Sequence, residues 1–314
     1  MSVPSSAENT GLFGRLYSNA YLLLVLTTAM WGGHSVVSRL AVGEISPASL
    51  TFLRWVIVAG IMLSLRGQGL REYWPILKPR MVYLALMGAL GYTSYNILLY
   101  WSAHSTTAIN ISIINGAMPA LIFAGAFLVF GQRIAAIQWI GMVISTAGVI
   151  LTGAKGDLQH LLDLTINRGD ILILIAVILY SGYSVLLRKR PMVPSLVFFA
   201  AMTPAALLSS FIPLGIEIAR GEFFWPSLKG WLLLTYVAIC PSLLSQIFFI
   251  RAVELIGAGR AGLFTNLMPL FGAGLAVLIL GETLALYHVV ALALVLGGIL
   301  LAEWRGKRVP PTAP

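Results

Sequence analysis

The chain contains the same pattern of five long apolar segments twice, in residues 18–154 and in residues 169–304. In the third to fifth segments the copies correspond at an offset of 150 residues, which pairs Asn96 with Gln246, Met118-Pro119 with Met268-Pro269, and Gly148 with Gly298. In the first segment the offset is 149, which pairs Trp31–Arg39 with Tyr180–Arg188. Because five is odd, the second copy of a membrane-crossing unit starts from the opposite face. The two halves are therefore predicted to have inverted topologies.

Composition supports a membrane protein. Apolar residues make up 59% of the chain and charged residues 10%, whereas soluble domains have roughly 45–50% and 25%. Residues 21–37, 171–187 and 284–301 contain no Asp, Glu, Lys or Arg, and about 20 such residues form a helix that crosses about 30 Å of hydrocarbon. The predicted fold class is an all-α integral membrane protein with ten transmembrane helices, arranged as two inverted five-helix repeats.

Breaks in the apolar pattern divide the chain. The ten predicted spans are residues 18–40, 47–66, 80–101, 106–130, 135–154, 169–189, 195–219, 229–252, 257–280 and 286–304. The predicted domains are an N-terminal tail (1–17), a first repeat (18–154), a connecting loop (155–168), a second repeat (169–304) and a C-terminal tail (305–314).

The positive charges predict the orientation. Of the 20 Lys and Arg residues, 14 fall on the side of the N terminus, five fall on the other side, and Arg54 lies within a span. Lys and Arg are enriched in cytoplasmic loops, so both tails are expected in the cytoplasm of a cell with a bacterial-type inner membrane. The net charge of +9 is spread over short loops without interleaved aromatic residues. The lipid bilayer is therefore the expected partner rather than nucleic acid, and monomer and homodimer both remain open.

Two prolines mark candidate hinges at matched positions. Pro119 and Pro269 lie near the middle of the fourth and ninth spans. A proline deprives the carbonyl four residues earlier of its helical partner, here the carbonyls of Asn115 and Thr265. Matched irregular backbone near the middle of the membrane is typical of transporter binding sites. A simple packing kink is the alternative.

Polar residues recur at helical spacing within the spans. Trp31, His34 and Ser38 share one face of the first span, and Tyr180 and Tyr183 share a face of its repeat. Such a stripe avoids lipid and either lines a cavity or joins helices by hydrogen bonds. The residues predicted to line a substrate site are Trp31, His34, Tyr95, Asn96, Asn115, Tyr180, Tyr183, Gln246, Thr265 and Asn266.

The residues within the spans argue against catalytic, metal and cofactor sites. No Asp or Glu falls at the middle of a span, so His34 is the one candidate for a proton relay there. Arg251 and Glu254 are predicted to pair at spacing i, i+3 near the end of the eighth span. The single Cys240 excludes an internal disulfide and a cysteine-ligated metal cluster. We therefore predict no catalytic residues, no metal and no cofactor.

The chain resembles the EamA-type transporters of the drug/metabolite transporter superfamily. The motifs that carry the resemblance are Trp31-Gly32, Phe52-Leu53-Arg54, Met118-Pro119 through Gly131-Gln132, Asn266-Leu267-Met268-Pro269 through Gly281-Glu282, and Gly297-Gly298. The first repeat departs from the family pattern at Gln132, where the family usually has Glu. Within this family the chain is most similar to the YddG-type exporters of aromatic amino acids and methionine.

The resemblance and the polar residues favour a secondary carrier that exports a small neutral or zwitterionic metabolite by alternating access. Aromatic faces, amides and hydroxyls suit an amino acid. A carrier of phosphorylated or nucleotide-linked sugars would need cationic groups in the cavity, and Arg54 is the one deep candidate. An intramembrane enzyme would need clustered catalytic groups. A non-transporting membrane subunit would need no central polar stripe.

Overall fold

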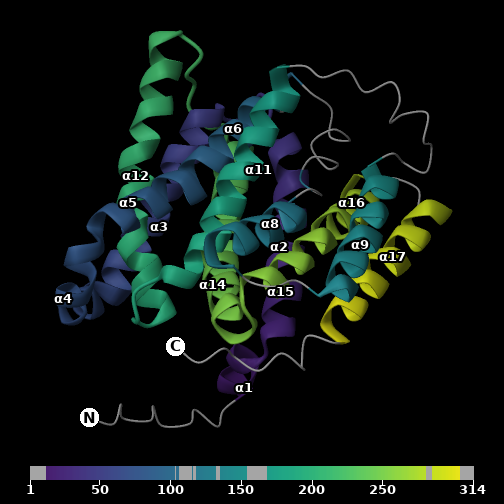
Figure 1. The fold of residues 1–314 in the computed structure, drawn as a ribbon. Coiled ribbons are helices and arrows are strands. Elements are labelled where there is room, and N and C mark those ends of the chain that lie inside the picture. The colour runs from purple at the N-terminus through teal and green to yellow at the C-terminus, as the bar shows by residue number, and fades with distance from the viewer. Residues whose placement is uncertain are drawn as a thin grey trace.

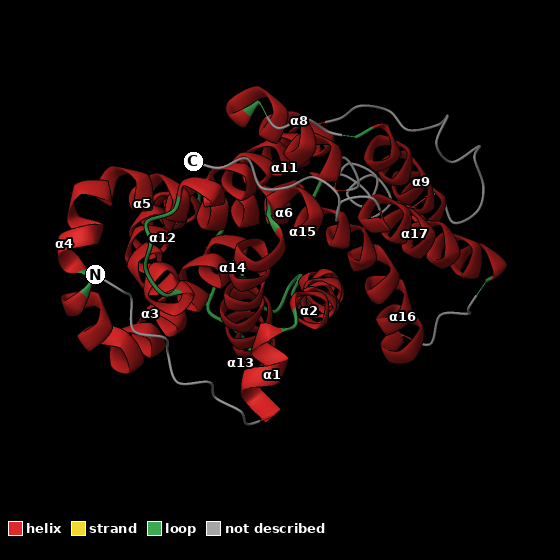
Figure 2. Cartoon of the chain, turned by 60° about the horizontal axis from the view of Figure 1, so that its bottom comes forward, coloured by secondary structure: helices red, strands yellow, loops and turns green. Residues whose placement is uncertain are grey.

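A computed structural model describes residues 12–102, 104–105, 115, 118–131, 135–153, 168–280 and 285–304. These residues form helices, turns and short connections without a β-strand, as Figure 2 shows. Gln132, Glu282, most of the predicted connecting loop, the start of the fourth predicted span, the C-terminal tail and the first eleven residues lie outside the described residues.

The first half begins with a short helix within the predicted N-terminal tail. In chain order its helices are α1 (Leu12–Ser18), α2 (Ala20–Leu40), α3 (Pro47–Glu72), α4 (Trp74–Leu77), the 3-10 turn η1 (Lys78–Arg80), α5 (Met81–Gly88), the π-helix η2 (Ala89–Ser94), α6 (Tyr95–Ser102), α8 (Met118–Phe130) and α9 (Ala136–Gly153).

The second half follows the same order. Its helices are α11 (Arg168–Leu186), the 3-10 turn η3 (Leu187–Lys189), α12 (Ser195–Ala219), α13 (Leu228–Val237), the π-helix η4 (Ala238–Leu244), α14 (Ser245–Ile256), α15 (Ala258–Leu263), the 3-10 turn η5 (Phe264–Leu267), α16 (Met268–Leu280) and α17 (Leu286–Trp304).

Among the described residues, seven helical stretches are long and apolar enough to cross a membrane. They are Ala20–Ser38, Pro47–Leu65, Trp74–Ser102, Ile171–Lys189, Ser195–Ala219, Leu228–Ile256 and Ala258–Ile279. Two shorter apolar stretches, Ala136–Gly148 and Val289–Ala302, lie in the fifth and tenth predicted spans. The all-helical class agrees with the prediction, and the total of ten spans stays a prediction.

The two halves fold around each other (Figure 1). α2 packs along α14 and α16 of the second half, and α11 packs along α6 and α8 of the first half. By the repeat, α2 corresponds to α11, α14 to α6, and α16 to α8, so the two sets of contacts are related by the same correspondence. Two further sets of corresponding helices contact each other directly, α3 with α12 and α9 with α17. Figures 1 and 2 show the α9–α17 pair beside α16, on the side away from α3 and α12.

Small residues allow α9 and α17 to approach closely. A Cβ added at Gly298 would lie 2.5 Å from the carbonyl oxygen of Gly141, and one added at Gly148 would lie 2.8 Å from that of Ala291. The two contacts are equivalent under the repeat, because at an offset of 150 Gly141 corresponds to Ala291 and Gly148 corresponds to Gly298. Close packing at small residues is a common way for helices to associate in membranes.

Each half has a π-helical turn at the matched position of its third long helix. These turns are η2 and η4. In each turn a serine hydroxyl donates to the carbonyl five residues earlier: Ser94 to Ala89 at 3.0 Å and Ser242 to Val237 at 2.6 Å. π-Turns are rare in proteins, and those that occur frequently lie at functional sites. Apolar periodicity does not predict these turns, although Pro241 within η4, which lacks a backbone N–H, is a local signal.

The end of the bundle away from α1 holds a contact between the halves. The loop after α2 meets the start of α13, where the backbone N–H of Ser227 donates to the carbonyl of Glu44 at 2.9 Å. The Glu44 carboxylate accepts from the Ser227 hydroxyl and pairs with Lys229 at 3.2 Å. The Ser227 hydroxyl and the Lys229 ammonium hold the pKa of Glu44 below its ordinary value.

The α1 end has the corresponding contact from the other half. There Arg80, the last residue of η1 before α5, donates to the carbonyl of Lys189 in the turn that follows α11, at 2.9 Å. Both ends thus use the connection between the first and second long helices of one half to hold the third long helix of the other. This is the arrangement expected of an inverted repeat.

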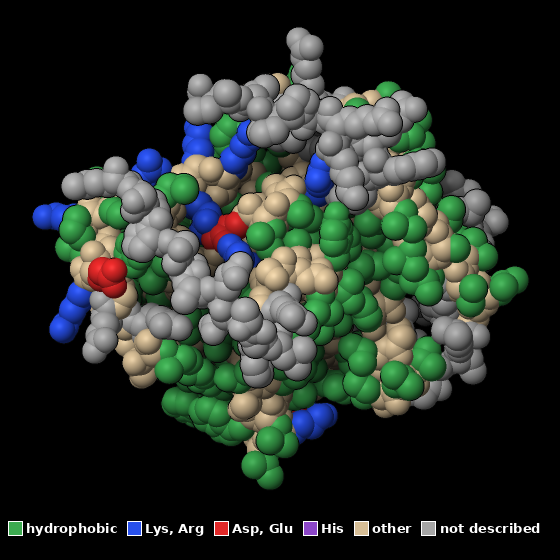
Figure 3. Space-filling view, turned by 90° about the horizontal axis from the view of Figure 1, so that it is seen from below, with side chains coloured by type: hydrophobic (Ala, Val, Ile, Leu, Met, Phe, Trp, Pro, Cys, Tyr) green, Lys and Arg blue, Asp and Glu red, His purple; other side chains and the backbone are tan. Residues whose placement is uncertain are grey.

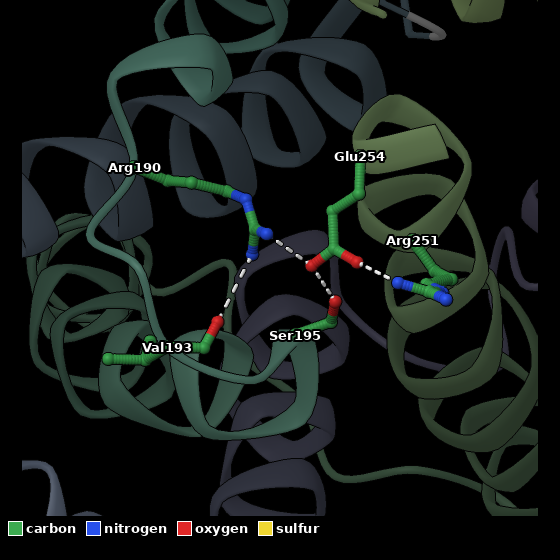
Figure 4. Close-up of polar contacts among 5 residues, drawn as sticks. All are labelled: Arg190, Val193, Ser195, Arg251 and Glu254. Atoms are coloured by element: carbon green, nitrogen blue, oxygen red, sulfur yellow. Dashed lines mark hydrogen bonds and ion pairs between the residues drawn. The ribbon is translucent and has the colours of Figure 1, made fainter. Parts of the chain in front are cut away.

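An ion cluster also lies at the α1 end (Figure 4). Glu254, near the end of α14, accepts from Arg251 at 2.6 Å, and it also binds Arg190 and the hydroxyl of Ser195. The predicted i, i+3 pair of Arg251 and Glu254 is confirmed. The Arg251 guanidinium also lies 5.3 Å from the ring centre of Tyr17 in α1. Figure 3, seen from this end, shows Lys and Arg side chains gathered around an acidic one, with hydrophobic side chains over much of the remaining surface.

Candidate functional site

A cavity of about 50 Å³ lies between the two halves. The first half lines it with Trp31, His34, Arg54, Trp55, Tyr95, Asn96, Leu99, Asn115 and Met118. The second half lines it with Tyr180, Pro241, Ser242, Gln246, Thr265, Asn266 and Met268. Every predicted site residue except Tyr183 is in this lining. The periodic polar residues of six predicted spans therefore meet at one place, together with Arg54 and Trp55 from the second span.

Tyr183 is the exception, because its side chain packs in the core and is not among the residues that line the cavity. It is 2% exposed, and its hydroxyl shares a hydrogen bond with Tyr92 at 2.9 Å. A Cβ added at Gly91 would lie 2.3 Å from the Tyr183 ring. The glycine in η2 thus admits the Tyr183 ring, which packs against the backbone there.

Aromatic rings form one wall of the cavity. Tyr180 contacts Trp31 edge to face, with ring centres 5.8 Å apart, and contacts Tyr95 with ring centres 5.1 Å apart. Trp31 comes from α2 and donates its indole N–H to the carbonyl of Pro241 in η4 at 3.4 Å. The ring of Trp55 stacks on that of Tyr92 at 5.0 Å. Such a wall can bind an apolar or aromatic group and can attract a cation through the ring faces.

The π-helices help to position polar lining residues. The carbonyl of Tyr92 in η2 accepts a hydrogen bond from the Asn96 side chain at 2.5 Å. The carbonyl of Pro241 in η4 accepts from Trp31, as described above, and from the hydroxyl of Ser245. In both halves, therefore, a carbonyl of the π-turn bonds a side chain at or near the cavity.

The two predicted hinge prolines each occupy the second position of a helical segment, Pro119 in α8 and Pro269 in α16. α16 follows the 3-10 turn η5 directly. The carbonyl of Thr265 accepts a hydrogen bond from the backbone N–H of Met268, so the prediction that Pro269 leaves this carbonyl without a partner is wrong. The tighter 3-10 turn provides the partner that an α-helix would lack. Residues 116 and 117 before Pro119 lie outside the described part.

Three polar side chains connect α2, α3 and α6 beside the cavity. Arg54 Nη1 donates to the hydroxyl oxygen of Tyr100 at 3.2 Å, and this hydroxyl lies 2.5 Å from His34 Nε2. Because the Tyr100 oxygen accepts from Arg54, its own proton is available to His34 if Nε2 is the unprotonated nitrogen. Arg54 is 2% exposed and His34 is 7% exposed. The sequence signal for Arg54 was its place as the single charge deep within a span.

The amides of the lining differ in their partners. Asn266 donates its side-chain N–H to Ser145 at 2.7 Å, and its Oδ1 atom is buried without a protein partner. Gln246 Oε1 is likewise buried without a partner. Asn115 Oδ1 accepts from the Tyr95 hydroxyl at 3.3 Å. Two lining residues of the second half, Gln246 and Asn266, thus carry acceptor oxygens that have no hydrogen-bond partner among the described residues.

No Asp or Glu belongs to the described lining. Within the described part of the chain, no three His, Cys, Asp or Glu side chains lie close enough to hold a metal ion. The groups that the cavity offers are therefore aromatic rings, amides, hydroxyls, one imidazole and one guanidinium. They suit reversible binding of a small polar molecule with an apolar part.

Comparison with known proteins gives a consistent result. The profile of the EamA-like transporter family matches residues 18–154 and again residues 167–304. The uncharacterized transporter YetK of Bacillus subtilis (strain 168) is 24% identical, over 98% of this chain and 93% of its own length. YyaM of the same organism, also an uncharacterized transporter, is 23% identical over 91% and 93%. The uncharacterized inner membrane transporter YedA of Escherichia coli (strain K12) is 26% identical over 96% and 94%.

A solved crystal structure of a protein has the same fold. It superposes with a TM-score of 0.73 at 18% sequence identity and covers 92% of this chain and 98% of its own. The profile matches both halves of the present chain, and its apolar helices are those of a multi-pass membrane protein. The chain belongs to the EamA-like transporter family and is a membrane transporter.

Proposed function

We propose that this protein is a secondary carrier that exports small zwitterionic metabolites, specifically amino acids with aromatic or thioether side chains. The observation that carries the proposal is the lining of the cavity. Aromatic rings of Trp31, Tyr95 and Tyr180 accompany buried amides from both halves. Rings bind an apolar side chain, while amides and Arg54 bind charged groups.

Alternating access is the proposed mechanism, because inverted repeats favour exchange between two related conformations. A cavity of about 50 Å³ has room for a few water molecules, at about 10–15 Å³ each. An amino acid would enter only when helices around the cavity move apart. Pro119 and Pro269 are the proposed hinges of that movement, because a proline has no backbone N–H to donate and helices kink most often at proline.

Transport is proposed to be facilitated diffusion. A proton-coupled carrier usually has an ionisable carboxylate near the middle of the membrane, and no Asp or Glu belongs to the described lining. His34 is the remaining candidate for a weak proton linkage. Export would then follow the gradient of the substrate out of a loaded cytoplasm.

A transport assay tests the function. The purified protein in proteoliposomes is expected to exchange radiolabelled tryptophan, phenylalanine or methionine against the same unlabelled amino acid, without accumulation driven by an imposed pH gradient. Exchange of glucose 6-phosphate without any amino acid would favour the sugar-phosphate carrier instead. If none of these solutes moves, the carrier proposal fails and a non-transporting subunit becomes the better account. Accumulation driven by pH would reject facilitated diffusion, and its loss in His34→Ala would assign the coupling to His34.

Labelling tests the proposed topology of ten spans with both termini in the cytoplasm of a bacterial-type inner membrane. Cys240 is the single native cysteine, so Cys240→Ser provides a background for single-cysteine mapping. A cysteine at Ser5 is expected to resist a membrane-impermeant maleimide in intact cells and to react after lysis. A cysteine at Glu222, in the exposed loop after α12, should react in intact cells. The reverse pattern would overturn the orientation.

A further inference from the structure

Arg54 is a buried charge at the cavity without an acidic partner among the described residues. It lies in α3, is 2% exposed and belongs to the cavity lining. Its hydrogen-bond partner in the described structure is the neutral Tyr100 hydroxyl, at 3.2 Å from Nη1. Its guanidinium carbon lies 5.3 Å from the ring centre of Trp55, and its Nε atom has no partner.

Such a buried guanidinium group is suited to bind an anion. Arginine stays charged in proteins and offers donors in a planar fork that matches the two oxygens of a carboxylate. A buried charge is costly unless a counter-charge and further hydrogen bonds compensate it. Tyr100 satisfies one donor, and the face of Trp55 contributes a weaker attraction. A bound carboxylate would supply both the missing charge and the missing acceptors.

The second half supplies the opposite kind of group. Gln246 Oε1 in α14 and Asn266 Oδ1 in η5 are acceptors, both buried and without a hydrogen-bond partner in the part of the chain that the structure describes. The Asn266 side chain is held by its donor bond to Ser145 at 2.7 Å. Gln246 and Asn266 are 7% and 1% exposed. An ammonium group, which has three donors and no acceptor, complements such oxygens.

We propose that Arg54 binds the carboxylate of the transported solute and that Gln246 Oε1 and Asn266 Oδ1 bind its ammonium group. This inference rests on the proposed function and deepens it. The substrate class is then α-amino acids recognised at both charged groups, bound in one orientation. The carboxylate faces the first half of the chain and the ammonium group faces the second. The aromatic wall takes the side chain.

Three probes separate the two contacts: L-phenylalanine, hydrocinnamate, which lacks the ammonium group, and phenethylamine, which lacks the carboxylate. Binding to the full-length protein in detergent is measured by titration calorimetry. Arg54→Gln is expected to weaken phenylalanine and hydrocinnamate about 10- to 100-fold, the effect of a hydrogen bond to a charged group. Phenethylamine binding should be unchanged. Arg71→Gln, an exposed arginine of the same helix, is the matched control and should bind all three probes like the wild type.

The reciprocal variant tests the other contact. Gln246→Met keeps the side-chain length and removes the acceptor. It should weaken phenylalanine and phenethylamine about 5- to 10-fold and leave hydrocinnamate unchanged. If Arg54→Gln does not fold, as judged by gel filtration, Arg54→Lys replaces it. Lysine keeps the charge but loses the bidentate fork, so it should weaken the two carboxylates selectively.

The binding results for the Arg54 and Gln246 variants can be distinguished from failure of the proposed amino acid transport. If no amino acid is exchanged in proteoliposomes, the amino acid assignment fails. Selective loss of hydrocinnamate binding in the Arg54 variant would then still support a carboxylate contact. An Arg54 variant that binds all three probes normally, or weakens all three equally, overturns that contact. Equal weakening of all three by Gln246→Met overturns the ammonium contact, and a wild-type protein that binds none of the probes overturns the whole proposal.

Discussion

Replacing Gly298 with leucine is expected to leave little folded protein, because the new side chain would force two helix backbones apart. A Cβ at this position would lie 2.5 Å from the carbonyl oxygen of Gly141 and 2.7 Å from the amide nitrogen of Ser145. Both atoms belong to the backbone of α9 and cannot rotate away as a flexible side chain can. Overpacking of this kind costs about 3 kcal/mol, which lowers the Tm by on the order of 10 °C. Fluorescence-detected gel filtration and thermal unfolding in detergent measure both effects.

The neighbouring glycine provides a matched control. Gly297 is exposed, and a Cβ there would have no heavy atom within 4 Å. Gly297→Leu should therefore behave like the wild type in both assays. Gly141→Leu should resemble Gly298→Leu, because its Cβ would lie 2.6 Å from the carbonyl oxygen of Gly298. If leucine at 297 and at 298 gave the same unfolding temperature, α9 and α17 could not pack as closely as described.

The helical class and the correspondence between the halves could be predicted from the spacing of apolar segments. Matched residues such as Gly148 and Gly298 showed which positions are equivalent. A repeat does not show which helices touch, because equivalent segments can pair with each other or with any other segment. The close approach of Gly141 and Gly298 depends on α9 and α17 lying side by side, which the repeat does not specify.

The π-helices were not predictable from apolar periodicity alone. A π-turn changes the direction in which a few side chains point, while the helix remains apolar and continuous. In η4 a proline was a local signal, but η2 contains none. At Pro269 the local signal was present, but it did not determine the local hydrogen bonding. Its effect on the hydrogen bond of Thr265 depended on whether the preceding turn could tighten to a 3-10 helix, and it does.

The cavity was predictable to the extent that polar residues on apolar helices avoid lipid. Nine of the ten predicted residues line one cavity, and Tyr183 lies outside its lining. Helical spacing put Tyr180 and Tyr183 on one face, and their ring centres are 5.3 Å apart. The glycine at position 91 nevertheless leaves room for the Tyr183 ring in the core. Arg54 was considered only as the deep cation that a sugar-phosphate carrier would need, because no local pattern connects it to its partner Tyr100 in another span.

Replacing Glu254 with glutamine is expected to destabilise the folded protein by about 3 kcal/mol, the cost of removing one member of a buried ion pair. The Glu254 side chain is 11% exposed and lies between the guanidinium groups of Arg190 and Arg251. A neutral amide would leave these two like charges close together without compensation. A fall in apparent Tm on the order of 10 °C is expected in detergent. Glu72→Gln changes an exposed carboxylate at the end of α3 and should leave the Tm unchanged.

A double variant that also replaces Arg190 tests whether Arg190 and Glu254 are coupled. In the double variant Arg190→Gln with Glu254→Gln, the repulsion between Arg190 and Arg251 is removed together with the carboxylate. The double variant should therefore be more stable than the sum of the two single effects by about 0.5–3 kcal/mol, the range for residues that interact directly. Additive effects would mean that Arg190 and Glu254 are not coupled. Coupling would show that the Glu254 carboxylate holds the connection between α11 and α12 against the end of α14, because Arg190 belongs to that connection and Glu254 to that helix.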